Sequence, residues 1–559
     1  MKEPKVIVIG LDGATLDLIE PWARDGYLPT FDRLLKEGSS GPLLTTFPPL
    51  TGPAWCSFIT GKSPALHGIL EFFYRQEGTY RQVLNNRSNM KGRSFWGLIG
   101  EAGKQVGVVG VPLTYPPEKV NGFLITGLLT PLGCKDFAHP PGLLAELETA
   151  LGPYRLRHDE KYRPNNPWPI LKEEDEVLAY NLQVARYLLQ EKPWDFFMMH
   201  FLVTDRIQHE FWHLIDPHHP NHNPDERKRL GNVVLDYYQK VDTAIAKIME
   251  VLPPDTMVLI MSDHGFGPVY KYINFNTWLH RQGLLSFKRS PFTGMRYLLF
   301  RLGLNYSVLA KLILGVGVGK QAVEVGRARR EQFQRRLFLS LDDVDWNRTQ
   351  VYSIGNFGQM YVNLKGREPQ GCVEPGQAYE RVLEDLTRRL YALRDPDTGE
   401  AVVSEVMRGP DIYQGPYQGQ APDLVFYTTR MEYKAMGLSD FSSPRVFDRV
   451  YGTTGHHRMN GVLIAHQPGL VPSGRQIKEA RIIDLAPTIL YRMGLPVPAS
   501  MDGKVLFDLF DPAFVRGNPL QISPDSDNSS SGSNIGAPAL SPDEEAELMD
   551  VLRGLGYVT

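Results

Sequence analysis

Aspartate, histidine and threonine side chains that could hold metal ions and activate a nucleophile occur at several separate places in this chain. Most of them stand beside a short apolar run, where a buried strand would end or begin. Carboxylates and imidazoles without thiolates suit borderline divalent ions such as Zn²⁺ and Mn²⁺. Two such ions about 4 Å apart favour in-line displacement at phosphorus. The residues are Asp12, Thr51, Thr60, Asp205, His209, Asp263, His264, His456 and His457.

Each of these residues has an ordinary structural explanation when it is taken alone. A single Asp after a strand is most often a helix cap, and a single buried histidine is usually a hydrogen-bonded core residue. Asp263-His264-Gly265 alone could be a turn. A functional site is favoured by their common position, because the ends of parallel strands meet at one edge of a sheet.

Short apolar runs alternate along the chain with stretches of helical periodicity. Glu174–Glu191 and Val233–Val251 carry apolar residues at every third or fourth position. This alternation predicts an α/β fold, a three-layer α/β/α sandwich with a mostly parallel central sheet. The predicted strands are Val6–Ile9, Val106–Val109, Phe196–His200, Val258–Met261, Leu424–Tyr427 and Val462–Ala465.

The strand–helix alternation is interrupted in the second half of the chain. An Arg-rich helix around Ala328–Arg336 and a hairpin at Tyr352–Leu364 indicate an inserted cap subdomain. A stretch rich in Ser, Pro, Asn, Asp and Gly predicts a disordered linker, and Ser541-Pro542 then begins a helix that docks on the body or on a second subunit. The predicted segments are 1–269 and 411–515 for the catalytic core, 270–410 for the insertion, 516–540 for the linker and 541–559 for the C-terminal helix.

The charge balance and the cysteine count exclude several classes of protein. The 559 residues include 60 Lys and Arg against 63 Asp and Glu, a net charge of −3, so no stable binding to nucleic acid is expected. Three cysteines in so long a chain exclude a disulfide scaffold. The apolar run at residues 5–10 is too short for a signal peptide, and charged residues interrupt Tyr297–Lys320, so we expect a cytoplasmic protein without a membrane span.

Taken in order, the motifs resemble the alkaline phosphatase superfamily, specifically its type I phosphodiesterase/nucleotide pyrophosphatase family. The similarity covers about residues 5–270 and 420–510 and implies an alkaline phosphatase-like fold. The matching motifs are Val8-Ile9-Gly10-Leu11-Asp12-Gly13, Pro49-Leu50-Thr51-Gly52-Pro53, Thr60-Gly61 followed by His67-Gly68-Ile69, Asp205-x-x-x-His209, Ser262-Asp263-His264-Gly265, Gly455-His456-His457-Arg458 and Asp484-Leu485-Ala486-Pro487-Thr488.

The resemblance implies a hydrolase with two divalent cations, Zn²⁺ or alternatively Mn²⁺. Thr51 would attack a phosphoester bond of a small substrate, such as a nucleotide, and form a phosphothreonine that water hydrolyses. His457 is preferred to His456 because it stands directly before Arg458-Met459-Asn460-Gly461, as the family's last histidine usually does. By similarity, one metal is held by Asp205, His209 and His457, and the other by Asp12, Thr51, Asp263 and His264.

The sequence departs from the family at one position. Nucleotide pyrophosphatases have an Asn a few residues after His-Gly-Ile that helps to hold a phosphate oxygen, and this chain has Phe72 there. We interpret Arg75 as a substitute donor and Phe72 as a wall of the substrate pocket. A surface position for Arg75 and a core position for Phe72 are the alternatives.

Three other functions remain open from the sequence. His209-Glu210-Phe211-Trp212-His213 matches His-Glu-x-x-His, the zinc-peptidase motif, but a peptidase leaves Asp12, Thr51 and His457 without a role. A phosphomonoesterase or a phosphotransferase such as a mutase would use the same scaffold. The third is a degenerate binding protein. The sequence is compatible with a homo-oligomer.

Overall fold

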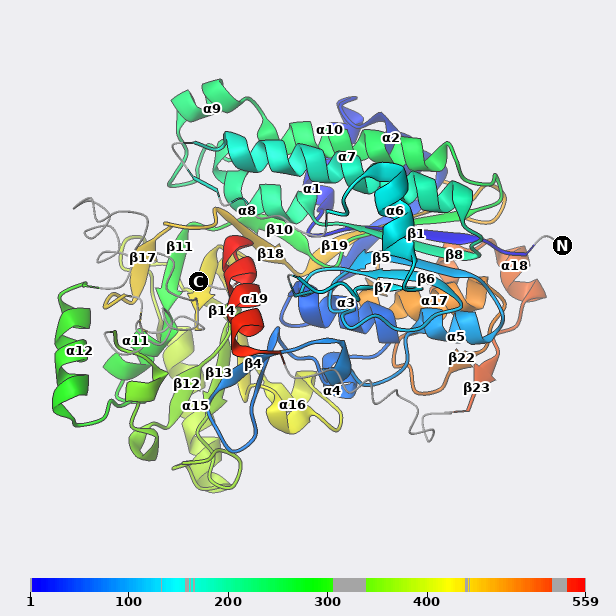
Figure 1. Ribbon diagram of the computed structural model, residues 1–559. Coiled ribbons are helices and arrows are strands. Elements are labelled where there is room, and N and C mark those ends of the chain that lie inside the picture. The colour runs from blue at the N-terminus through cyan, green and yellow to red at the C-terminus, as the bar shows by residue number, and fades with distance from the viewer. Residues whose placement is uncertain are drawn as a thin grey trace.

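The computed structural model describes residues 3–131, 133–155, 160, 162–163, 166–304, 338–437, 441, 443–524 and 540–557. The predicted Arg-rich helix and the later part of the predicted linker lie outside these residues. The described residues form a large twisted sheet between two layers of helices, with a second region of smaller sheets beside it (Figure 1).

The large sheet has ten strands among the described residues. Its central strands are parallel and bury nearly every side chain, which explains their continuous apolar sequences. In spatial order the strands are β20 (Arg475–Gln476), β2 (Ser39–Leu44), β19 (Asn460–His466), β9 (Met257–Met261), β1 (Val6–Leu11), β8 (Phe196–Phe201), β5 (Val106–Val111), β6 (Gly122–Thr126) and β7 (Ala138–His139), and β21 (Ala480–Arg481) also pairs with β2.

Alternate residues of the central strand contact different helical layers. Val6 and Val8 of β1 belong to one hydrophobic core, and Ile7 and Ile9 belong to the other. This confirms the predicted three-layer sandwich (Figure 1). The helices α1 (Leu16–Arg24), α2 (Pro29–Glu37), α7 (Trp168–Glu191), α8 (Val203–Ile215) and α10 (Val233–Met249) cover one face, and α3 (Thr51–Thr60), α5 (Phe95–Glu101) and α17 (Leu485–Arg492) cover the other.

The second region has its own sheets and its own hydrophobic core. The predicted hairpin at 352–364 is present as the antiparallel pair β12 (Val351–Ser353) and β13 (Gln359–Val362). Leu424–Tyr427 does form a strand, β15 (Leu424–Thr428), but it pairs with β13 and with β14 (Val403–Arg408) and not with the large sheet. A short apolar run identifies a strand but not its partners, so we propose that the insertion extends beyond residue 410.

The end of the chain returns to the core. The predicted linker begins with structured residues, because β23 (Ile522–Ser523) pairs with β22 (Val497–Pro498). Helix α19 (Pro542–Gly554) starts with a capping box between Ser541 and Glu544. Its apolar face packs into the core below the sheet, and Figure 1 shows it in red between the large sheet and the second region.

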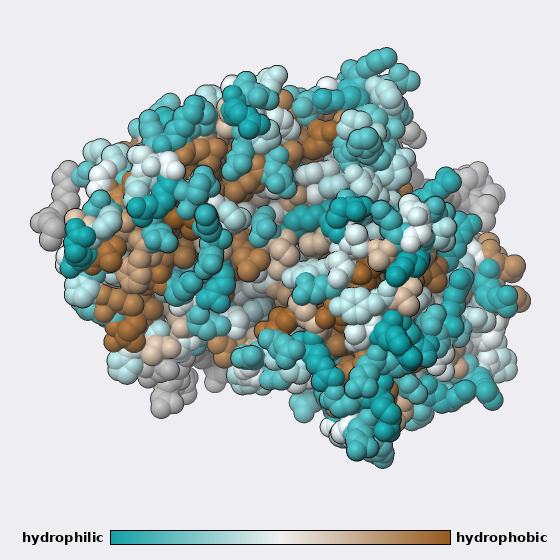
Figure 2. Space-filling view, turned by 180° about the vertical axis from the view of Figure 1, so that it is seen from behind, coloured by the Kyte–Doolittle hydropathy of each residue, from teal (hydrophilic) through white to brown (hydrophobic). Residues whose placement is uncertain are grey.

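On the face shown in Figure 2, hydrophobic residues gather in a brown area toward the left of the view and in smaller areas between teal and pale ones. Among the described residues, no helix is both long enough and apolar enough to cross a membrane.

Candidate metal centre and active site

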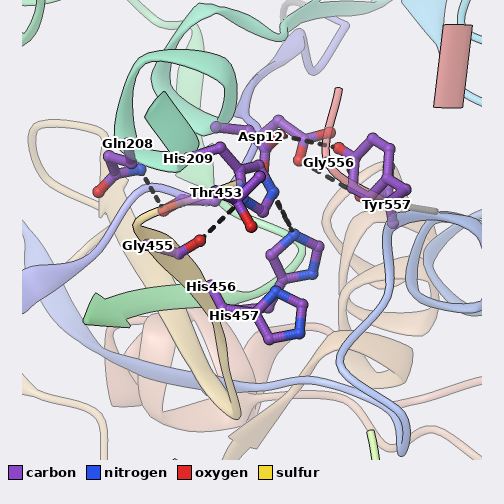
Figure 3. Close-up of polar contacts among 12 residues, drawn as sticks. Asp12, Gln208, His209, Thr453, Gly455, His456, His457, Gly556 and Tyr557 are labelled. Carbon is purple, nitrogen blue, oxygen red and sulfur yellow. Dashed lines mark hydrogen bonds and ion pairs between the residues drawn. The ribbon is translucent and has the colours of Figure 1, made fainter. Parts of the chain in front are cut away.

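Seven side chains from distant parts of the sequence lie together at the carboxyl edge of the central strands. Figure 3 shows three of them, Asp12, His209 and His457, around the end of the chain. None of the seven is more than 1% exposed. They are Asp12, Thr51, Asp205, His209, Asp263, His264 and His457, the set expected from the sequence.

Local structure explains how each side chain reaches the site. Asp12 directly follows β1, and Thr51 is the first residue of α3, where free main-chain N–H groups and the helix dipole favour negative charge. Asp205 and His209 are four residues apart in α8 and therefore share one face of that helix. His457 lies in β18 (Gly455–Arg458), which pairs with β10 (Gly265–Pro268) directly after the Asp263-His264 pair.

One group of ligands surrounds the Thr51 hydroxyl. Its Oγ1 lies 3.4 Å from Asp12 Oδ1 and 3.2 Å from His264 Nε2. His264 Nε2 also lies 3.3 Å from Asp263 Oδ2 and 3.5 Å from Asp12 Oδ1. Asp12, Asp263 and His264 are close enough to ligate a single cation.

The second group centres on Asp205. Its Oδ1 lies 3.3 Å from His457 Nε2 and 3.5 Å from His209 Nε2. The same oxygen is 4.0 Å from His264 Nε2. Asp205 therefore lies between the two groups, as a carboxylate shared by two adjacent cation sites would.

The hydrogen bonds of the histidines fix the nitrogen that is available for a metal. Nδ1 of His209, His264 and His457 donates to the main-chain carbonyls of Gly455, Gly265 and Pro49, respectively. Each Nε2 then carries a lone pair that points into the site. His209 Nε2 and His457 Nε2 are only 3.0 Å apart, so two lone pairs face each other unless a cation lies between them.

The carboxylates also suit a cation. Asp205 Oδ1 and Asp263 Oδ2 are buried and accept no hydrogen bond. Burial, and for Asp12 and Asp263 the neighbouring carboxylates, raises the pKa of these aspartates well above its usual value. Burial lowers the pKa of His457 to about 3, so this imidazole is neutral. Neutral imidazoles beside clustered carboxylates are the donor set that fits divalent cations.

His456 differs from its neighbour His457. Its ring stacks on Phe357 with a centroid distance of 4.3 Å, and neither of its nitrogens has a hydrogen-bond partner. It could join His209 and His457 in a group of three, but His457 alone also faces Asp205 and His264. The geometry thus favours His457 as the ligand.

The zinc-peptidase reading is wrong for this structure. A zinc peptidase needs both histidines of His-Glu-x-x-His on one ion, and here only His209 faces the site. His213 lies 3.3 Å from Thr454 Oγ1 and 3.4 Å from a Glu226 carboxylate oxygen. The His-Glu-x-x-His sequence in α8 therefore does not form a zinc-peptidase site.

Three other predicted residues lie in different places. Thr60 ends α3, and its hydroxyl donates to the Cys56 carbonyl, so it lies nine residues along the helix from Thr51. Arg75 pairs with Glu368 of the second region at 2.6 Å and donates to the Tyr352 hydroxyl at 2.7 Å. Phe72 is buried, and its ring lies beside the start of α3 at Gly52.

Some site residues were not anticipated from the sequence. His200, at the end of β8, lies 2.9 Å from Asp12 Oδ2, and its position within an apolar strand resembled that of a core residue. Tyr557 contacts both Thr51 and Asp205, and Lys434 is a buried ammonium nearby. No local pattern marks these two, because each reaches the site only through long-range folding.

Comparison with known proteins agrees with this geometry. A sequence profile described as type I phosphodiesterase / nucleotide pyrophosphatase matches residues 6–439. The chain belongs to this family. It is accordingly an enzyme that hydrolyses phosphoric esters, and its buried acids and imidazoles are suited to the metal dependence of such phosphodiesterases. No curated protein sequence matches the chain.

Solved structures share the fold of this phosphodiesterase family member. One is phosphonoacetate hydrolase from Sinorhizobium meliloti 1021 in complex with phosphonoformate, with a TM-score of 0.51, 14% identity, and coverage of 88% of this chain and 95% of the hydrolase. Another is inactive murine ectonucleotide pyrophosphatase / phosphodiesterase 5 in complex with AMP, with a TM-score of 0.50, 12% identity, and coverage of 91% and 100%. At these identities the likeness shows the fold alone.

Proposed function

We propose that this protein cleaves phosphodiester bonds of small phosphate esters, nucleotides among them, with two divalent cations and Thr51 as nucleophile. The observation that carries the proposal is the position of the Thr51 hydroxyl. This hydroxyl lies 3.4 Å from Asp12 Oδ1, which belongs to the first ligand group. The second ligand group is adjacent, because Asp205 Oδ1 lies 4.0 Å from Nε2 of His264 in the first group. A buried threonine needs such surroundings to become nucleophilic.

The residues divide into two ligand sets on this proposal. Bound cations, Zn²⁺ in preference to Mn²⁺, would supply Lewis acidity and neutralise the negative charge of the reacting phosphoryl group. Main-chain carbonyls hold His209, His264 and His457 with Nε2 directed inward, so the ligands are oriented before any cation binds. The proposed sets are Asp205, His209 and His457 for one cation and Asp12, Thr51, Asp263 and His264 for the other.

The reaction is a double displacement at phosphorus. Thr51 Oγ1 forms a bond to phosphorus as the bond to the leaving alcohol breaks, and its proton passes to an acceptor such as Asp12 Oδ1. The departing alkoxide takes up one proton, which balances the proton released by Thr51. Water then attacks the phosphothreonine, restoring the Thr51 hydroxyl and releasing the phosphate product, so that one water is consumed for each ester bond cleaved.

A matched pair of threonine variants tests this function. Thr51 and Thr60 are both buried hydroxyls of α3, but only Thr51 lies in the site. With bis(p-nitrophenyl) phosphate and added Zn²⁺ or Mn²⁺, Thr51→Ala should lose at least about 1000-fold in kcat, while Thr60→Ala retains activity. Full activity of Thr51→Ala would refute the nucleophile, and faster hydrolysis of p-nitrophenyl phosphate than of the diester would favour a phosphomonoesterase.

A further inference from the structure

The last described residues of the chain occupy the site that Thr51 faces. Helix α19 is held by Leu548, Leu552 and Leu555, each at most 2% exposed. Gly556 then turns the chain with a φ of 81°, and Tyr557 enters the cluster. Figure 3 shows Gly556 and Tyr557 among the metal-ligand side chains.

The phenol of Tyr557 joins the two ligand groups. Thr51 Oγ1 donates to the Tyr557 hydroxyl at 3.0 Å, and this hydroxyl donates to Asp205 Oδ2, also at 3.0 Å. The ring packs beside Phe72, with centroids 5.2 Å apart, and beside the imidazoles of His209 and His457. Tyr557 is 2% exposed, so it is as deeply buried as a core residue.

The backbone of the same two residues is also bound. Lys434 Nζ donates to the Gly556 carbonyl at 2.9 Å and to Thr453 Oγ1 at 3.2 Å. Asn356 Nδ2 donates to the Tyr557 carbonyl at 2.7 Å. Because Lys434 is only 1% exposed, its ammonium requires polar partners, and Gly556 provides one of them.

The phenol stands within the approach distance of Thr51. A reacting phosphorus must come to about 3–3.5 Å from the nucleophile. The Tyr557 oxygen already lies at that distance from Thr51 Oγ1, on the side that also faces Asp205. A phosphoester that approaches Thr51 from this side would meet the phenol.

We propose that Gly556–Tyr557 is an intramolecular competitor of the substrate, which must displace it before Thr51 can react. Lys434, released from the Gly556 carbonyl, then donates to the anionic substrate. The Tyr557 hydroxyl and the Gly556 carbonyl thus occupy the place of the substrate. The side chains that bind them, Thr51, Asp205 and Lys434, would line the substrate pocket. The inference rests on the proposed function for the role of Thr51, but the displacement itself can be measured without hydrolysis.

Kinetics of two variants give the first test. Tyr557→Phe removes both phenol hydrogen bonds, so KM for bis(p-nitrophenyl) phosphate should fall about 5- to 10-fold while kcat is maintained. Tyr491→Phe is the control, because it removes a partly buried phenol hydrogen bond to the Asn518 carbonyl, outside the site. A fall in kcat without a fall in KM would overturn the proposal and make Tyr557 a catalytic residue.

A second variant loosens the segment without touching the phenol. A Cβ at position 556 would lie 2.3 Å from Thr453 Cγ2, and the φ of 81° disfavours any side chain. Gly556→Ala should therefore lower KM as Tyr557→Phe does. Gly517→Ala is the control, since a Cβ there meets nothing within 4 Å. An unchanged KM in both active-site variants would contradict the competition.

Hydrogen exchange separates this inference from the proposed function. In the metal-loaded full chain, inorganic phosphate should accelerate amide exchange across residues 545–557, and Tyr557→Phe should accelerate it about 5- to 10-fold without phosphate. These readouts do not require Thr51 to be the nucleophile. If residues 545–557 of Tyr557→Phe exchange at the same rate as in the wild type, the inference is overturned, even if Thr51→Ala is inactive.

Discussion

Asp205 is the residue on which the two halves of the site depend. Its carboxylate faces His209 and His457 of one group and His264 of the other, and its second oxygen accepts from Tyr557. A buried carboxylate beside several imidazoles suits the binding of divalent cations, as the proposed function requires. The negative charge at this position therefore matters more than its hydrogen-bonding capacity.

Asp205→Asn tests this dependence on charge. The isosteric amide keeps the shape but removes the charge, so we expect metal content to fall below two ions per chain and kcat to fall at least about 100-fold. Elemental analysis after gel filtration measures the first effect. Asp242→Asn serves as control, because that buried carboxylate binds the main-chain N–H groups of Thr30 and Phe31 far from the site. Two ions per chain in Asp205→Asn would contradict Asp205 as a metal ligand.

A substitution of Glu210 distinguishes a phosphodiesterase from a zinc peptidase. In a zinc peptidase the Glu of the motif is the general base, and its amide variant is inactive. Here burial raises the pKa of Glu210 to about 7, and Glu210 does not belong to either group of ligand side chains, although its charge acts on Lys434. Glu210→Gln should keep phosphodiesterase activity within about 10-fold in a nitrophenyl diester assay. Near-total loss would mean that Glu210 takes part in the reaction.

At the scale of elements, the pairing of β10 with β18 brings His457 to the site. Gly455 lies at the end of this pair, opposite Pro268, and its carbonyl accepts from His209 Nδ1. A Cβ on Gly455 would lie 2.5 Å from the Gln208 carbonyl oxygen and 2.6 Å from the Phe266 ring. The glycine thus permits a close approach of β18 to α8.

Gly455→Ala should consequently weaken metal binding about 10- to 100-fold, because it displaces the carbonyl that orients His209. It should also destabilise the fold by about 1–3 kcal/mol through overpacking. Competition with a chromogenic chelator measures the affinity, and urea unfolding measures the stability. Gly419→Ala, where a Cβ has no neighbour within 4 Å, is the matched control. Equal metal affinity in the two variants would exclude this role of β18.

Strands and ligands were predictable from the sequence to different degrees. Buried parallel strands such as β1 have continuous apolar sequences, and Asp12 directly follows that pattern. β15 has the same appearance, but which sheet a strand joins is decided by pairing with distant residues. Tyr557 lies 506 residues from Thr51 in the chain, and no periodicity or spacing records such a contact.

At the scale of the whole molecule, cation binding should couple to folding stability. The unpaired oxygens of Asp205 and Asp263 and the facing imidazoles of the site are costly without a cation. A ligand present at 100 times its Kd stabilises the native state by about 2.7 kcal/mol per site. Chelation with EDTA should therefore lower the thermal midpoint, and Zn²⁺ or Mn²⁺ should restore it in a calorimetric scan. A midpoint that does not respond to EDTA or to added metal would contradict a metal centre in this cluster.

The buried carboxyl of Glu71 contacts Gln359 of the second region, and its ionisation should destabilise the folded protein. Glu71 is 6% exposed and accepts from the Phe72 main chain and from Gln359 Nε2 of β13. Burial raises its pKa from 4.5 to about 7, so the folded protein favours the neutral form. Its contribution to stability is fully present below pH 4.5 and is lost as pH rises to 7.

Glu71→Gln keeps the neutral shape at every pH, and Gln359 Oε1, which has no hydrogen-bond partner, can accept from the new amide. Between pH 5 and pH 8 the wild type should lose about 2 to 3 kcal/mol of unfolding free energy relative to this variant. Urea unfolding at both pH values with constant metal measures the difference. Glu77→Gln, at an exposed position of the same segment, controls for the loss of a charge. A difference between wild type and Glu71→Gln that does not change with pH would show that Glu71 is not held neutral between the two regions, and the contact with Gln359 would then be an ordinary charged hydrogen bond.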